Sequence, residues 1–145
     1  MSYSTSIFVD AAPDAVFDCL VIPEMMVRWM GERALLQAVA GGRFEVDING
    51  VLIRGQFIEI ERPRRLVVSW GQLGNALLPP GASRVTFELS GERDRTLVRL
   101  VHDDLPAPEA DKHAIGWPHF LGRLAVVASG GEPGPDPFAE TGPGR

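Results

Sequence analysis

The sequence predicts a single α+β domain, in which a curved antiparallel sheet of about six to seven strands and a long C-terminal helix enclose an apolar cavity. Three observations lead to this prediction. The length of 145 residues suits one domain with its own core. Residues 35–102 alternate between apolar and polar side chains, with turn residues at regular intervals. Residues 107–128 carry apolar side chains at helical spacing. We expect the domain to cover residues 1–129.

The N-terminal elements are expected to be one strand and two short helices. Residues 3–9 are rich in Ser, Thr and β-branched side chains, which favours a strand. Pro13 with an acidic residue beside it is typical of a helix start, and Pro23 is placed to open a second helical segment over residues 24–30. Gly31 should end that segment.

The first strands of the sheet should form a hairpin. Phe44, Val46 and Ile48 alternate with charged residues, so they are predicted to face the core. Asn49-Gly50 follows them and is the strongest two-residue hairpin signal in the sequence.

The next strand changes phase within its length. Val51 and Ile53 are in one alternation, whereas Ile58 and Ile60 are in the opposite one. Gly55 lies between the two pairs, and we expect a bulge or kink there that bends the sheet.

Three further strands complete the expected meander. A turn at 62–64, a long loop over 71–82 and a turn at 91–95 separate them. Their alternating, inward-facing residues are predicted to be Leu66, Val68 and Trp70, then Val85, Phe87 and Leu89, and finally Val98, Leu100 and His102.

The last helix should begin after Pro106 and run to about residue 128. Trp117, Leu121 and Leu124 form its apolar face, which we expect to lie on the sheet. Pro118 removes one backbone hydrogen bond, so we expect a kink beside it. Residues 130–145 are rich in Gly and Pro, and we expect them to form a disordered tail.

Composition argues against several classes of function. The net charge is -5 and no basic stripe is present, so we expect no nucleic-acid partner. The apolar runs are far shorter than the roughly 20 residues of a membrane span, and residues 1–5 do not resemble a secretory signal. We therefore expect a cytoplasmic protein with no membrane partner. Cys19 is the single cysteine, and we expect it to be buried.

No convincing catalytic, metal or cofactor site is present in the sequence. It lacks a nucleophile elbow, a phosphate-binding Gly loop and a zinc-binding helix motif. His113 and His119 are six residues apart, about 240° around a helix, so they cannot chelate one metal ion. Glu109 and His113 are expected to form a solvated pair on one helix face.

The aromatic residues are better candidates for function. Large apolar side chains from several elements are predicted to converge on one interior, and pockets for small molecules are mostly apolar with a few polar anchors. His102 is expected to be a hydrogen-bonded structural residue or a polar anchor at the cavity wall. The candidate ligand-binding residues are Trp29, Phe44, Ile53, Trp70, Phe87, His102, Trp117 and Leu121.

Nine short motifs, in order, also carry a resemblance to a known family. They are Pro13 with Val16-Phe17 and Leu20, Trp29-Met30-Gly31, Gly41-Gly42-Arg43-Phe44, Gly55 before Phe57, Arg62-Pro63, Leu66-Val67-Val68-Ser69-Trp70, Ser83-Arg84-Val85-Thr86-Phe87, Thr96 followed by Leu97 to His102, and His113 with Gly116-Trp117. Over residues 5–128 the chain resembles the bacterial AHSA-like branch, named after the activator of heat-shock-protein ATPase homologue, of the START (SRPBCC) superfamily. The resemblance implies the helix-grip, birch-pollen-allergen-like fold.

Three functions remain open at this point. The first is binding of a small hydrophobic or aromatic molecule, lipid-like or polyketide-like, without a cofactor. The second, implied by the superfamily, is a metal-free cyclase or hydrolase that uses His102 as acid or base, which requires access to His102 from the cavity. The third, a co-chaperone or protein-interaction domain, draws on the family name alone. Neither a protein partner nor the identity of a ligand follows from the sequence.

Overall fold

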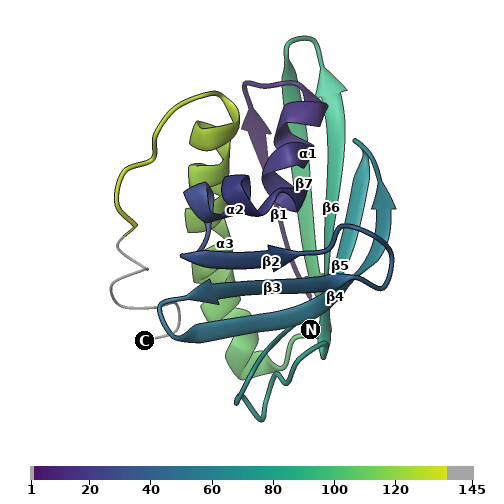
Figure 1. Cartoon of the computed structure of the whole chain (residues 1–145), viewed down its shortest axis with the longest axis vertical. Coiled ribbons are helices and arrows are strands. Elements are labelled where there is room, and N and C mark those ends of the chain that lie inside the picture. The colour runs from purple at the N-terminus through teal and green to yellow at the C-terminus, as the bar shows by residue number, and fades with distance from the viewer. Residues whose placement is uncertain (1, 137–145) are drawn as a thin grey trace.

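The computed structural model describes residues 2–136 and has one seven-stranded antiparallel sheet with three helices (Figure 1). The strand order in the sheet is β1-β7-β6-β5-β4-β3-β2, so β1 and β2 are its two edges. The elements are β1 (Tyr3–Val9), α1 (Pro13–Val21), α2 (Pro23–Trp29), β2 (Arg33–Leu36), β3 (Arg43–Ile48), β4 (Val51–Glu61), β5 (Arg65–Gln72), β6 (Ser83–Glu92), β7 (Arg95–Asp103) and α3 (Ala107–Ala128).

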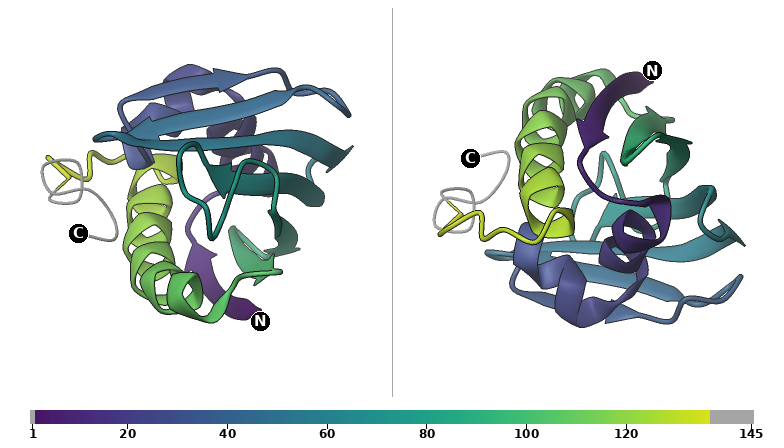
Figure 2. Two further views of the ribbon diagram at one scale, coloured as in Figure 1. Left: turned by 90° about the horizontal axis from the view of Figure 1, so that it is seen from below. Right: turned by 90° about the horizontal axis from the view of Figure 1, so that it is seen from above.

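The sheet curves around α3, as the two end-on views in Figure 2 show. The backbone of α3 comes close to β1, α1 and α2. On its other side, large side chains span the distance between α3 and the middle of the sheet. This arrangement is the α+β helix-grip architecture that the sequence predicts. No helix among the described residues is long and apolar enough to cross a membrane.

The predicted hairpin is present between β3 and β4. Ile48 pairs with Val51 across Asn49-Gly50, and both turn residues have positive φ angles of 42° and 86°. Asparagine and glycine tolerate this left-handed backbone, which the two-residue turn requires. Phe44, Val46 and Ile48 are buried, as their alternation predicts.

The bulge in β4 is three residues from the predicted position. The pairing of β4 with β5 is in one register from Ile53 to Phe57 and shifts between Phe57 and Glu59, so Ile58 is the extra residue. The prediction of a bulge at Gly55 is therefore wrong. Gly55 serves a different purpose, because a Cβ there would collide with the backbone carbonyl of Ser69 on β5.

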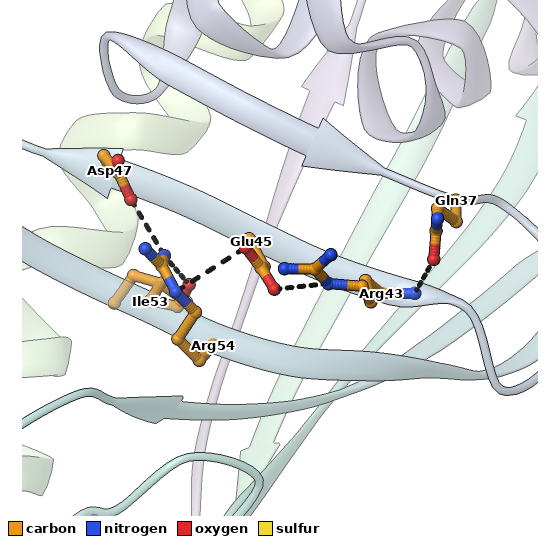
Figure 3. Close-up of polar contacts among 6 residues, drawn as sticks. All are labelled: Gln37, Arg43, Glu45, Asp47, Ile53 and Arg54. Atoms are coloured by element: carbon orange, nitrogen blue, oxygen red, sulfur yellow. Dashed lines mark hydrogen bonds and ion pairs between the residues drawn. The ribbon is translucent and has the colours of Figure 1, made fainter.

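The outer face of β3 and β4 carries a row of ion pairs (Figure 3). The Arg54 guanidinium is 2.8 Å from the Asp47 carboxylate and 3.7 Å from the Glu45 carboxylate. Arg43 lies 2.8 Å from the other oxygen of Glu45. Glu45 and Arg54 are directly opposite each other in the register, which is the arrangement in which cross-strand charges attract most effectively.

Helix α3 continues without interruption from Ala107 to Ala128, with Pro118 inside it. Residues 130–136 follow the helix and make polar contacts with α2 and α3. Arg28 lies 2.8 Å from Glu132, and His119 Nε2 lies 2.7 Å from Asp136. The remainder of the predicted tail, 137–145, lies outside the described residues, so the tail boundary at residue 130 stays a prediction.

Candidate functional site

A cavity of about 50 Å³ lies between α3 and the concave side of the sheet. Its apolar lining comes from α3, from β3–β5 and from the end of α2, and the described residues that supply it are Met30, Ile48, Ile53, Trp70, Trp117 and Phe120. The other described residues of the lining are Gln72, Lys112, His113 and Gly116. We call this space the aromatic cavity.

The periodicities of one strand and one helix place these side chains together. Trp70 and Gln72 are two residues apart on β5, so they share the concave face of the sheet. On α3 the lining residues fall at 112, 113, 116, 117 and 120, which is the spacing of one helix face. The Trp70 and Trp117 ring centroids lie 5.1 Å apart across the space between β5 and α3.

His102 is at the centre of a buried chain of hydrogen bonds behind the cavity. Trp117 Nε1–H donates to His102 Nδ1 over 3.0 Å, and His102 Nε2 lies 2.7 Å from Ser83 Oγ. Because an indole N–H can only donate, the proton of the neutral imidazole is on Nε2 and is donated to Ser83. The Ser83 hydroxyl in turn donates to the Trp70 carbonyl over 2.7 Å. Every side-chain nitrogen and oxygen in this hydrogen-bond network thus has a partner.

His113, on α3, belongs to a second hydrogen-bond network. Trp70 Nε1–H donates to His113 Nε2 over 3.2 Å. His113 Nε2 is then the acceptor, so the ring proton is on Nδ1 and is donated to the Glu109 backbone carbonyl, 2.8 Å away. The two imidazole rings lie edge to face with their centroids 4.9 Å apart. The two tryptophans therefore fix the tautomers of the two histidines.

Both imidazoles are held in the neutral form. Burial lowers the pKa of His102 to about 3, and the nearby His113 contributes in the same direction. Burial also lowers the pKa of His113, although the Glu109 carbonyl and carboxylate partly oppose it. Protonating either ring would place a charge in an apolar interior and replace an acceptor nitrogen with a donor.

Glu109 is a buried carboxylate at the start of α3, with 1% of its surface exposed. The Lys112 ammonium lies 3.4 Å from Glu109 Oε2, while Oε1 has no hydrogen-bond partner among the described residues. The expectation that Glu109 and His113 form a solvated pair is wrong, because the Glu109 side chain is enclosed and His113 bonds to its backbone instead.

The eight candidate residues are placed in three different ways. Ile53, Trp70 and Trp117 line the aromatic cavity. Phe44, Phe87 and His102 pack one layer behind it, against Trp70 or Trp117. Trp29 and Leu121 are buried in the core, where Trp29 Nε1–H donates to the Cys19 carbonyl over 2.8 Å. The participation of these residues in ligand binding stays a prediction.

The sequence reasoning did not select seven of the lining residues, which are Met30, Ile48, Gln72, Lys112, His113, Gly116 and Phe120. A signal for two of them existed, because His113 and Phe120 are four residues before and three residues after Trp117 on a helix. Gln72 and Lys112 gave no such signal, since a polar residue at the end of a strand or in the early turns of a helix is ordinarily expected to be solvent-exposed. Cys19 is fully buried, as predicted, and burial together with Asp18 raises the pKa of its thiol to about 11.

One protein-family profile matches most of the chain. The family profile described as "Activator of Hsp90 ATPase homolog 1-like protein" matches residues 10–129, which is most of the chain. The chain belongs to this family. The resemblance inferred from the nine motifs is thereby confirmed. A comparison with curated proteins gave no match.

Three solved structures have the same fold as this chain. CalU16 from Micromonospora echinospora is 28% identical with a TM-score of 0.76, over 97% of this chain and 80% of that one. The protein MLL2253 from Mesorhizobium loti is 17% identical with a TM-score of 0.80, over 89% and 97%. PFC0360w from Plasmodium falciparum, described as an HSP90 activator, is 23% identical with a TM-score of 0.71, over 89% and 96%.

Proposed function

We propose that this protein binds a small apolar or aromatic molecule in the aromatic cavity. The observation that carries the proposal is an apolar space, lined by two tryptophans and a phenylalanine, beside which the ring nitrogens of Trp70, Trp117, His102 and His113 are neutral and already hydrogen-bonded. An apolar ring can enter such a space without leaving a buried donor or acceptor unpaired. The cytoplasmic location predicted from the sequence is part of this proposal.

The size of the cavity limits the ligand. A volume of about 50 Å³ is well below the roughly 300–1,000 Å³ of pockets that enclose a drug-sized molecule. The cavity therefore suits a single ring or a short chain, and even this ligand requires lining side chains to move. Met30 and Lys112 are unbranched and can change rotamer at low cost, so they are the side chains that enlarge the space.

Gly116 offers a sharp test of this proposal. It lies in the lining of the cavity, and a Cβ built on it meets no atom within 4 Å. In Gly116→Ala, the added methyl group should occupy part of the cavity without strain. Gly122 on the same helix also has open space for a Cβ but does not line the cavity, so Gly122→Ala is a matched control.

The experiment is a toluene titration of ¹⁵N-labelled protein, followed through the indole N–H signals of Trp70 and Trp117. Both variants should gain about 0.5–1 kcal/mol of stability, because alanine is the better helix former. We expect toluene to shift the signals in the wild type and in Gly122→Ala, and to bind at least fivefold more weakly to Gly116→Ala. Equal binding to both variants, or no binding to the wild type, would overturn the proposal.

The two other functions have less support. The acid–base role of His102 needs access from the cavity, but the residue has no exposed surface and both ring nitrogens are occupied. A heat-shock-protein partner draws on the family description, and the contacts of the described residues do not single out a surface for it. We propose neither.

A further inference from the structure

Most of the hydrogen-bonding groups left free around the aromatic cavity are donors. Trp70 and Trp117 have each given their single N–H to a histidine, and His113 has used both ring nitrogens. Among the described lining residues, only Gln72 and Lys112 retain polar atoms that can turn to a ligand.

The orientation of the Gln72 amide follows from its neighbour. Asn75 Nδ2–H donates to Gln72 Oε1 over 3.0 Å, which turns the oxygen of the amide toward Asn75. No acceptor among the described residues bonds Gln72 Nε2. Two amide N–H groups are therefore available at this end of the cavity.

Lys112 supplies a positive charge at the same cavity. Its ammonium carries three N–H donors, and the one described partner is Glu109 Oε2 at 3.4 Å, longer than a typical charge-assisted hydrogen bond. Its side chain is 49% exposed, so the stem can swing without unpacking the core. Lys112 is the only charged side chain among the described lining residues, since His113 is neutral and Glu109 does not reach the cavity wall.

We propose that the ligand of this cavity is a small aromatic carboxylate, with its ring against Trp70 and Trp117 and its carboxylate on Gln72 Nε2 and the Lys112 ammonium. This inference rests on the proposed function and adds the class of ligand. A carboxylate has only acceptors and its two oxygens match the two free donor groups, whereas an amine, which is charged at neutral pH, would face the like charge of Lys112. Glu109 also pairs with the Lys112 ammonium, which limits how much the charge of Lys112 adds to the affinity for a carboxylate.

The test compares three ligands that share one ring: toluene, phenylacetamide and phenylacetate. The indole N–H shifts of Trp70 and Trp117 report the site, and the titrations give three affinities. We expect phenylacetate to bind at least threefold more tightly than phenylacetamide. Raising the NaCl concentration should reduce this preference, because the exposed charge of Lys112 is screened.

Two substitutions locate the source of the preference. Lys112→Gln removes the charge but keeps an N–H for Glu109, so it should bring phenylacetate and phenylacetamide to equal affinity. Lys112→Arg keeps the charge and should preserve the preference. Toluene is titrated into the wild type and both variants as the reference, and the preference of each protein is the ratio of its phenylacetate and phenylacetamide affinities.

The outcomes separate this inference from the proposed function. If toluene binds but phenylacetate binds no better than phenylacetamide, the carboxylate inference is wrong and the apolar cavity stands. A preference for phenylacetate that survives in Lys112→Gln also contradicts it. If no compound shifts the signals of Trp70 or Trp117, the proposed function fails and the inference fails with it.

Discussion

The polar side chains on the two faces of this sheet differ in charge and in exposure to water. On the outer face, Arg54 lies between the carboxylates of Asp47 and Glu45, and all three side chains are between one fifth and about one quarter exposed (Figure 3). On the inner face, His102 has no exposed surface and is bonded to Trp117 and Ser83, with no charge on any of them.

The difference shows how access to water decides the chemistry of a network. Water solvates the outer charges, so an ion pair forms there at low cost and also contributes little. A charge on the inner face would lose its hydration, which costs several kcal/mol by order of magnitude. The inner network therefore uses neutral donors and acceptors, and its stability depends on every atom having its partner. Substitutions in the inner network should therefore lower the free energy of unfolding more than substitutions in the outer network.

The largest effect is expected from breaking the inner network at its centre. His102→Leu removes the acceptor of Trp117 Nε1–H and leaves that donor buried and unpaired. We expect a loss of about 3 kcal/mol in the free energy of unfolding, measured by urea denaturation.

The double variant His102→Leu/Trp117→Phe serves as the control for this interpretation. It removes both partners of the bond, so its loss should be smaller than the sum of the two single losses. If the loss in the double variant equals the sum of the two single losses, the hydrogen bond between Trp117 and His102 does not contribute to the free energy of unfolding.

The next effect is a loss of stability in mild acid. The folded protein holds the pKa of His102 near 3, below its ordinary value of 6.5, so the unfolded chain binds the proton first as pH falls. The contribution of His102 is complete above pH 6.5 and is lost as the pH falls toward 3. His113, whose pKa is also lowered, acts in the same direction. From pH 6.5 to 5 we expect a loss of about 2 kcal/mol.

Urea denaturation at several pH values measures this slope. Aspartate and glutamate have ordinary pKa values near 4, so the upper part of the window mainly reports histidines. In His102→Gln the slope should be shallower than in the wild type by up to about 1.4 kcal/mol per pH unit. A slope that does not change in this variant would show that His102 binds its proton as readily in the folded protein as in the unfolded chain.

The smallest effect is expected on the outer face. Arg54→Met keeps most of the aliphatic stem and removes the charge between Asp47 and Glu45, and should cost about 1 kcal/mol or less. Adding about 0.5 M NaCl should shrink the difference between variant and wild type, because salt screens exposed pairs. Thermal or urea denaturation at low and high salt measures both quantities.

Arg43→Gln is the matched control for this prediction. Arg43 is 57% exposed and contacts only one of the two carboxylates, so its replacement should have almost no effect. An Arg54 variant that loses as much stability as the His102 variant would contradict the comparison of the two faces.

Much of the fold could be predicted because its signals are local. The alternation of Phe44, Val46 and Ile48, the Asn49-Gly50 turn and the apolar face of α3 are each properties of a few neighbouring residues, and the structure has all of them. The bulge in β4 was misplaced because a phase change between Ile53 and Ile60 indicates that an extra residue exists without fixing which one it is.

The candidate site was predictable only in part. Trp70 and Trp117 could be expected to face the interior from periodicity, and they do line the cavity. Their hydrogen bonds to His113 and His102 could not be predicted, since the partners come from elements 43 and 15 residues away. The same limit applies to Glu109, whose burial results from how the start of α3 packs and not from its neighbours in sequence.

The sequence by itself determined the elements, their order and the family, because hydrophobic periodicity and turn chemistry act over a few residues. Only the tertiary structure decided which side chains border the cavity, how little space they leave and which proton each histidine carries. These properties depend on distances between side chains that are remote in the chain. The curvature of the sheet around α3 sets those distances, and no short stretch of residues encodes them.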